Sequence, residues 1–289
     1  MIFVGLSVIC SVLLGFIFKL FPRFGVDSFQ AIIFNYYTCL VCGWVQMGKF
    51  PVAADGWTAP WMPFALILGC IFISGFNFAA LTVRYFGVTI SQIMQKMSIL
   101  ITVPFAILVY RESAGAGKIF GFLLALASII LVNWPSGDLE KPGQTGKKWL
   151  WIPFVTWALS GALEMIILTV KQEKLVDPNN PSFITTVFCT AGTIGLAIAV
   201  AGWMTRRIRF SWRNVAGGII LGIPNYGSML FLLMALGSGM EGSLVFPAVN
   251  VSIILVTTIL AVALFQERLN SIKWTGFLLA LLSIVLISR

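Results

Sequence analysis

The segment KIFGFLLALASIIL, residues 118–131, recurs later in the same chain as KWTGFLLALLSIVL, residues 273–286. Ten of the fourteen aligned positions are identical, at a constant separation of 155 residues. An apolar composition explains matching leucines and alanines, but it does not place Lys, Gly, Phe and Ser in register. The same separation relates Glu112 to Glu267, and each glutamate ends a long apolar run. The chain therefore contains an internal duplication.

The composition indicates whether water or lipid surrounds this protein. Of its 289 residues, 59% are hydrophobic and 10% are charged, and the mean hydropathy is +0.97. A soluble globular protein is roughly 45–50% apolar and about 25% charged. A water-soluble fold of this length cannot bury so much apolar surface, so lipid must cover the excess.

Apolar runs bounded by Gly, Pro, Trp and charged residues predict ten membrane spans. The runs are too long and too uniformly apolar for the alternating strands of a barrel, so we expect helices. The predicted fold class is an all-α integral membrane protein. The predicted spans are residues 2–20, 29–47, 62–82, 87–110, 116–133, 149–170, 182–203, 212–235, 241–265 and 272–288.

The duplication predicts how these spans are organised. The longest polar stretch, residues 135–148, would be a linker between a first repeat (1–134) and a second repeat (149–289). Each repeat has five spans, an odd number, so the second copy must enter the membrane in the opposite orientation. Inverted repeats of this kind are typical of secondary transporters, which bind substrate near mid-membrane at the repeat interface.

Two five-span halves, each with a glutamate-containing short loop before a glycine-containing last helix, resemble the drug/metabolite transporter superfamily, EamA type. The loops are Arg111-Glu112 and Glu267-Arg268. The resemblance covers essentially the whole chain. It implies a ten-helix carrier of amino acids, sugars, nucleotides or drugs, with a central cavity lined by the first, third and fourth helices of each half.

The side on which the two termini lie is left open by the sequence. An even number of spans places both termini on one side of the membrane. The distribution of Lys and Arg among the loops favours the outside, whereas the resemblance implies the inside.

Several function classes are disfavoured. The net charge of +9 resides mostly in inter-span loops, where lipid headgroups explain it, so we expect no nucleic-acid partner. The chain has no histidine and no phosphate-binding loop, so we predict neither an enzyme nor a cofactor or metal site. Cys39 and Cys42 have C-x-x-C spacing but lie inside an apolar run, and we interpret them as core residues.

Two ionisable residues lie inside predicted spans, Lys96 in the fourth and Glu164 in the sixth. An ionisable side chain at the bilayer centre costs roughly 2.5–3.5 kcal/mol on insertion scales, so it is a functional candidate by default. We expect both to face the central cavity as a charge pair. The alternative is a buried ion pair that only holds the bundle together.

Gln92 and Gln95 accompany Lys96. Residues four apart share one face of a helix, so Gln92 and Lys96 would together bind a polar or anionic substrate group. A polar stripe of this kind also binds neighbouring helices, and the sequence favours neither interpretation.

The remaining candidates are polar residues in other spans. Asn77 and Asn225 occupy similar places in the two halves, and Tyr226 and Asn250 would complete a mixed polar and aromatic cavity wall. Packing amides are the alternative. Glu241, at the start of the ninth span, is interpreted as a helix cap.

The predicted function is that of a secondary transporter, which moves a small polar or amphipathic metabolite (amino acid, sugar, nucleoside or drug-like) by alternating access. Its partners would be that substrate, the lipid bilayer and protons as the coupling ion, and we expect a multi-pass protein of the cell (inner) membrane. A flippase for lipid-linked carriers is the alternative, and a non-transporting membrane scaffold is a third possibility, disfavoured by the short loops.

Overall fold

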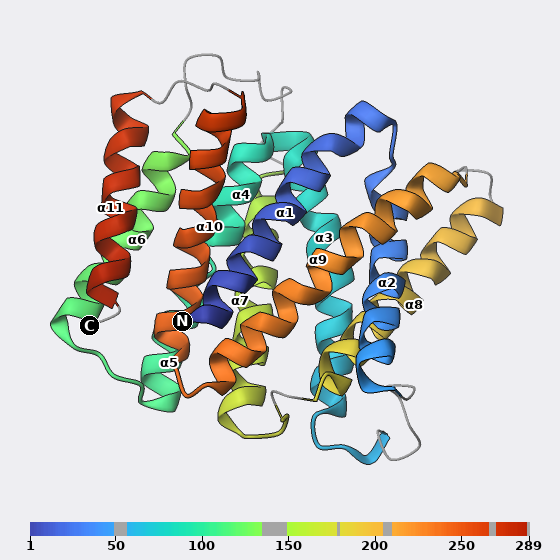
Figure 1. The fold of residues 1–289 in the computed structure, drawn as a ribbon, viewed down its shortest axis with the longest axis horizontal. Coiled ribbons are helices and arrows are strands. Elements are labelled where there is room, and N and C mark those ends of the chain that lie inside the picture. The colour runs from blue at the N-terminus through green and yellow to red at the C-terminus, as the bar shows by residue number, and fades with distance from the viewer. Residues whose placement is uncertain (49–56, 135–148, 178–179, 205–209, 266–269, 288–289) are drawn as a thin grey trace. The chain divides into compact units, whose positions relative to one another are not determined.

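The computed structural model describes residues 1–48, 57–134, 149–177, 180–204, 210–265 and 270–287, and these ranges are helical with short connections. Figure 1 shows the helices in chain order. Their bounds are α1 (Ile2–Phe24), α2 (Ser28–Met47), α3 (Met62–Phe86), α4 (Val88–Lys96), α5 (Ile99–Tyr110), α6 (Ala116–Val132), α7 (Trp151–Gln172), α8 (Ser182–Met204), α9 (Trp212–Gly237), α10 (Gly242–Phe265) and α11 (Ser271–Ile287).

The predicted fold class is confirmed. Each predicted span overlaps one helix, except residues 87–110, which include both α4 and α5, and α1 and α3 end four residues beyond the predicted ends. Seven helical segments of the described residues are long and apolar enough to cross a bilayer, and α6 and α11 are shorter apolar helices. The limits of the two repeats stay a prediction, and the predicted linker, residues 135–148, lies outside the described residues.

The helices form two compact units that do not follow the order of the chain. The first unit comprises Met1–Ser74 and Thr169–Ser238, and the second comprises Gly75–Leu168 and Gly239–Arg289. The boundaries fall within α3 and α7. Each unit therefore contains helices from both halves of the sequence.

In the first unit, α2 packs antiparallel on α8. A Cβ atom on Gly43 would lie 2.1 Å from Thr185 Oγ1, and one on Gly195 would lie 3.0 Å from Ile33 Cγ1. These contacts are reciprocal, because 152 residues separate Ile33 from Thr185 and also Gly43 from Gly195. The crossing therefore has the internal two-fold symmetry that an inverted repeat requires.

Helix α9 completes the first unit by packing on α1 and α2. A Cβ atom on Gly222 would lie 2.4 Å from Thr38 Cβ, so only glycine permits this approach to α2. The Ser7 hydroxyl of α1 donates to the Ser228 carbonyl at 2.9 Å. Asp27 begins α2 by accepting a hydrogen bond from the Gln30 N–H.

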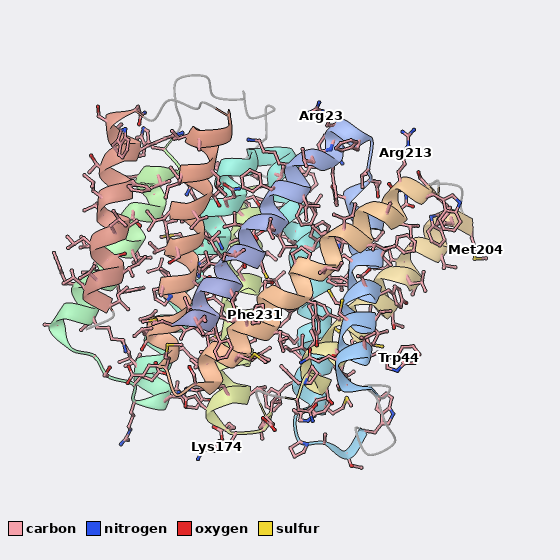
Figure 2. All side chains as sticks on the ribbon, in the orientation of Figure 1. Arg23, Trp44, Lys174, Met204, Arg213 and Phe231 are labelled. Atoms are coloured by element: carbon pink, nitrogen blue, oxygen red, sulfur yellow. The ribbon has the colours of Figure 1, made fainter. Side chains whose placement is uncertain are left out.

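The outward surface of the first unit fits a lipid environment. Trp44 and Met204 point away from the helices in Figure 2, and their exposed fractions are 49% and 80%. Arg23 and Arg213 lie together at one end of the unit, while Lys174 lies at the other. Apolar side chains on the outside, with charges at the two ends, are the arrangement that a bilayer selects.

In the second unit, α6 and α11 run side by side (Figure 1). Gly121 of α6 contacts Leu286 and Ile287, near the end of α11. Gly276, near the start of α11, contacts Leu131 and Val132 at the end of α6. The two copies of the duplicated segment therefore run antiparallel, as the prediction of inverted repeats requires.

Helix α10 begins on a carboxylate from another element. Glu112 accepts hydrogen bonds from the N–H groups of Gly242 at 2.9 Å and Ser243 at 2.8 Å. The first free N–H groups of a helix attract a negative charge, and Glu112 is only 8% exposed. Glu241 directly precedes α10, and its carbonyl accepts hydrogen bonds from the Leu244 and Val245 N–H groups, while its carboxylate contacts Lys118 and Ser113.

Candidate functional site

The fourth predicted span is interrupted within the second unit. Helix α4 ends at Lys96, and α5 begins at Ile99 after the turn residues Met97 and Ser98. The Met97 carbonyl accepts hydrogen bonds from the Leu100 N–H at 3.0 Å and from Trp157 Nε1 at 2.9 Å. We expected one continuous helix here, since neither Gly nor Pro lies at the break. The interruption places the end of one helix and the start of another beside α7.

One face of α7 is directed at this break. Trp157, Gly161 and Glu164 follow the i, i+4, i+7 spacing of residues on one side of a helix. A Cβ atom on Gly161 would lie 2.4 Å from Ile101 Cδ1, so the glycine permits α7 to approach α5 closely. Trp157 and Glu164, two turns apart, thereby reach opposite sides of that contact.

Five side chains from four helices form a connected group, which we call the charged cluster: Lys96 (α4), Ser98 and Thr102 (α5), Glu164 (α7) and Asn250 (α10). Lys96 Nζ donates to Asn250 Oδ1 at 3.0 Å, and Asn250 Nδ2 donates to Glu164 Oε1 at 3.1 Å. The Ser98 hydroxyl donates to Glu164 Oε1 at 2.9 Å, and the Thr102 hydroxyl donates to Glu164 Oε2 at 2.6 Å. The structure thus brings together the two charges singled out in the sequence and joins them through Asn250.

The orientation of the Asn250 amide follows from its neighbours. A lysine ammonium has donors only, so the amide oxygen must face Lys96. The amide nitrogen then faces Glu164, where a carboxylate oxygen accepts. Asn250 therefore satisfies a positive and a negative group at once, which no apolar residue of similar size can do.

Burial differs between the charged and the neutral members of the charged cluster. Ser98 and Thr102 are fully buried and Asn250 is 7% exposed, whereas Lys96 and Glu164 are half-buried. The buried neutral groups form hydrogen bonds to the two charged side chains, and each charged side chain remains partly exposed. Ionisable residues within a membrane span usually face a bundle interior or a water-filled space, and they mark substrate or ion pathways.

The other candidates of the second unit lie on α4 and α3. Gln95 is exposed and donates to the Ser91 hydroxyl of its own helix at 3.2 Å. Gln92 is exposed one turn before Lys96, and Asn77 is half-buried on α3. That these three bind substrate stays a prediction.

Asn225 and Tyr226 belong to the first unit. Asn225 Nδ2 donates to Asn35 Oδ1 at 3.1 Å, and the Tyr226 hydroxyl donates to Gln46 Oε1 at 2.6 Å. Both residues of α9 are therefore bonded to α2. Their predicted membership of the same site as Lys96 stays a prediction.

Ser98, Thr102 and Trp157 were not predicted from the sequence as residues of the site. Serine and threonine are common inside membrane helices, and tryptophan is usually an interface residue. The Ser98 hydroxyl does not cap α5, because it donates to Glu164 Oε1.

Comparisons with known proteins bear on the fold of the chain and on its family. Residues 152–289 match the model of the EamA-like transporter family. A protein of Haemophilus influenzae, described as uncharacterized, is 23% identical over 292 residues, which is 96% of this chain and 94% of the relative. A solved crystal structure superposes with a TM-score of 0.75 over 99% of this chain and 94% of its own, at 11% identity, and supports the fold alone.

The family match lies in the second half of the chain and includes α7 and α10, which supply Glu164 and Asn250. Proteins of this family are membrane transporters of the drug/metabolite transporter superfamily, with small-molecule substrates and a lipid bilayer around them. The chain is a multi-pass membrane protein, and its residues 152–289 are similar to the EamA-like transporter family.

Proposed function

We propose that this protein is a secondary transporter that moves a small polar or amphipathic metabolite across the cell's inner membrane by alternating access. The charged cluster is its substrate site, and protons carried by Glu164 drive the transport. The observation that carries the proposal is the chain of hydrogen bonds from Lys96 through Asn250 to Glu164, which joins α4, α10 and α7.

The helix interruption supports this proposal. Interrupted helices are typical of transporter binding sites near mid-membrane. Here the last turn of α4 carries the cation Lys96, and the first turn of α5 lies beside the carboxylate of Glu164. Each charge is on the side that the helix dipole favours, since helix C-termini attract cations and N-termini attract anions.

The position of the charged cluster also suits a conformational change. It links helices of both sequence halves, α4 and α5 from the first and α7 and α10 from the second. Bending of α5 or α10 would change the distances between Lys96, Asn250 and Glu164. Pro104 in α5 and Pro247 in α10 lie within these helices, where a proline removes a backbone hydrogen bond and favours bending.

The experiment is transport by the purified protein in liposomes. Metabolites are first selected by thermal stabilisation of the protein in detergent, and uptake is then measured with and without a pH gradient. We expect Lys96→Ala and Glu164→Gln to abolish uptake. Lys174→Ala and Glu173→Gln, which alter exposed charges after α7, are matched controls and should transport normally. Full activity of both cluster variants, at normal amounts in the membrane, would disprove the assigned site.

A further inference from the structure

The hydrogen bonds of the charged cluster are distributed unequally between its two charges. The carboxylate of Glu164 accepts three, from Ser98, Thr102 and Asn250. Among the residues that the structure describes, the Lys96 ammonium has a single acceptor, Asn250 Oδ1. A carboxylate has about four acceptor positions and an ammonium has three donors. Glu164 is therefore nearly saturated, while Lys96 retains two N–H groups for a ligand.

We propose that the transported substrate is an organic anion, whose carboxylate or similar group binds Lys96, and that it moves together with one proton on Glu164. This inference rests on the proposed function and names its substrate class. The half-buried ammonium needs acceptors, and an anionic group supplies two of them. A cationic substrate would instead have to displace the buried donors that already occupy Glu164.

Charge balance within the membrane explains the proton. The empty cluster holds one positive and one negative group, so its net charge is zero. An added anion makes the loaded cluster negative, and a net charge is costly in a medium of low dielectric constant. Lys96 is the charged residue that faces Glu164, while α5 and α10 present the neutral Ser98, Thr102 and Asn250. A proton on Glu164 restores neutrality.

Thr102 allows Glu164 to carry that proton without rearrangement. The hydroxyl oxygen of Thr102 lies 2.6 Å from Glu164 Oε2 and 3.3 Å from the Ser98 carbonyl oxygen. When Glu164 is ionised, the Thr102 hydroxyl donates to Oε2. When Oε2 is protonated, it donates to Thr102 Oγ1, and the Thr102 hydrogen turns to the Ser98 carbonyl. Both states of Glu164 are hydrogen-bonded with the heavy atoms in place.

The order of events is a cotransport of the anion with one proton. On the side where the cluster is open, the anion binds Lys96 and a proton from water binds Glu164 Oε2. On the other side the anion leaves, and the proton returns to water. Each cycle moves one negative and one positive charge in the same direction, so the cycle transfers no net charge.

The test uses probes that share a body and differ in charge. Three series are compared on the purified full-length protein in detergent: acetate, glycine and methylamine; isovalerate, valine and isobutylamine; 3-phenylpropionate, phenylalanine and phenethylamine. Binding is followed by thermal stabilisation, and proton uptake by a pH dye in weakly buffered solution. We expect the anion of at least one series to bind most tightly, with uptake of about one proton for each anion bound.

The variants separate the two roles. Lys96→Met should weaken anion binding by ~10- to 100-fold, the loss expected for a hydrogen bond to a charged group. Thr102→Val should reduce proton uptake, whereas Thr102→Ser should retain it. Thr186→Val, which removes a similarly buried hydroxyl bonded to its own helix, is the matched control and should change neither measurement.

Tighter binding of the zwitterion or of the amine in every series, or the binding of no anion, would overturn the inference. Anion binding without proton uptake would overturn its second part. These measurements concern binding and do not depend on transport. A protein that binds anions with proton uptake, but moves nothing across liposomes, would therefore disprove the proposed function while the anion site stands.

Discussion

Gly121 of α6 and Ile287 of α11 are in direct contact, and Gly276 of α11 and Val132 of α6 repeat that contact. A Cβ atom on Gly121 would lie 2.9 Å from Ile287 Cγ1 and 2.9 Å from Leu286 Cβ. On Gly276 it would lie 2.9 Å from Val132 Cγ2 and 2.8 Å from Leu131 Cβ. The equivalent contacts have nearly equal distances because a local two-fold axis relates the two duplicated helices.

This crossing predicts that both glycines are required for stability. Gly121→Val and Gly276→Val should each destabilise the protein by ~1–3 kcal/mol, the usual cost of overpacking. Thermal unfolding in detergent measures the change. Gly117→Ala, in the same helix but with its nearest atom at 4.0 Å, is the control and should have little effect. Equal melting temperatures for all three variants would contradict the reciprocal packing.

We expect that Asn250 can be substituted only when Glu164 is changed at the same time, so that the cluster keeps one positive and one negative charge. Asn250→Leu removes an acceptor from Lys96 and a donor from Glu164, so we expect a stability loss of ~1–3 kcal/mol for the unsatisfied groups, together with loss of transport. Asn250→Asp places a second carboxylate beside Glu164 and should also inactivate the protein.

The double variant Asn250→Asp with Glu164→Gln restores one cation and one anion and should recover part of the stability lost in the Asp variant. Thermal unfolding and liposome uptake are compared across the four proteins. The absence of any coupling between the two substitutions would show that the residues do not interact.

Trp157 should stabilise the interruption between α4 and α5. Trp157→Phe keeps the aromatic body but removes the donor to the Met97 carbonyl, and we expect a loss of ~0.5–1.5 kcal/mol and slower transport. Trp212→Phe is the control, because Trp212 is 77% exposed at the start of α9. The two variants are compared by thermal unfolding and by uptake rate, and a Trp157 variant as active as the control would exclude this role.

The ion pair between Lys118 and Glu241 predicts a pH dependence outside the spans. Burial opposes ionisation of Glu241, but hydrogen bonds from Lys118 and Ser113 and the charge of Lys118 outweigh it and lower its pKa to about 2. A carboxylate whose pKa is lowered by folding stabilises the protein above its ordinary pKa of 4.5, and this contribution is lost as the pH falls toward about 2.

We therefore expect the melting temperature of Glu241→Gln to lie slightly below that of the natural protein, by a constant amount from neutral pH to about pH 5. The difference should shrink at lower pH. The effect is small because 39% of the Glu241 side chain is exposed. Lys118→Ala should reproduce it. Lys273 is the counterpart of Lys118 in the second copy of the duplicated segment. The position 155 residues before Glu241 is Phe86, which is not acidic, so Lys273→Ala should not reproduce the effect. A difference that grows on acidification would contradict the pair.

The bounds of the helices were predictable because the bilayer dictates them. A span needs about 20 apolar residues, so Met62 and Ser182 were recognised as starts to within a residue or two. The inversion was predictable from the match of residues 118–131 with 273–286 and from the odd number of spans, five, in each repeat. Lys96 and Glu164 were recognisable because intramembrane charge is costly.

The connections within the charged cluster were not predictable. Whether Asn250 bonds a lysine or another amide depends on which helices meet, and periodicity does not contain that information. The similar positions of Asn77 and Asn225 in the two halves likewise did not predict the partner of Asn225, which donates to Asn35 of α2. No Gly or Pro in the sequence predicts the interruption after Lys96. Two hydrogen bonds connect it to α7: Trp157 donates to the Met97 carbonyl, and Ser98 donates to Glu164.

The reciprocity of the two glycine crossings has a consequence for the ancestry and assembly of the chain. A surface that is complementary to its own duplicate is the surface of a symmetric homodimer. Gly43 and Gly195 in one crossing, and Gly121 and Gly276 in the other, are the residues such a dimer would share. Fragments 1–134 and 149–289, synthesised as separate polypeptides in one cell, should therefore find each other and reconstitute the protein without a peptide bond between them.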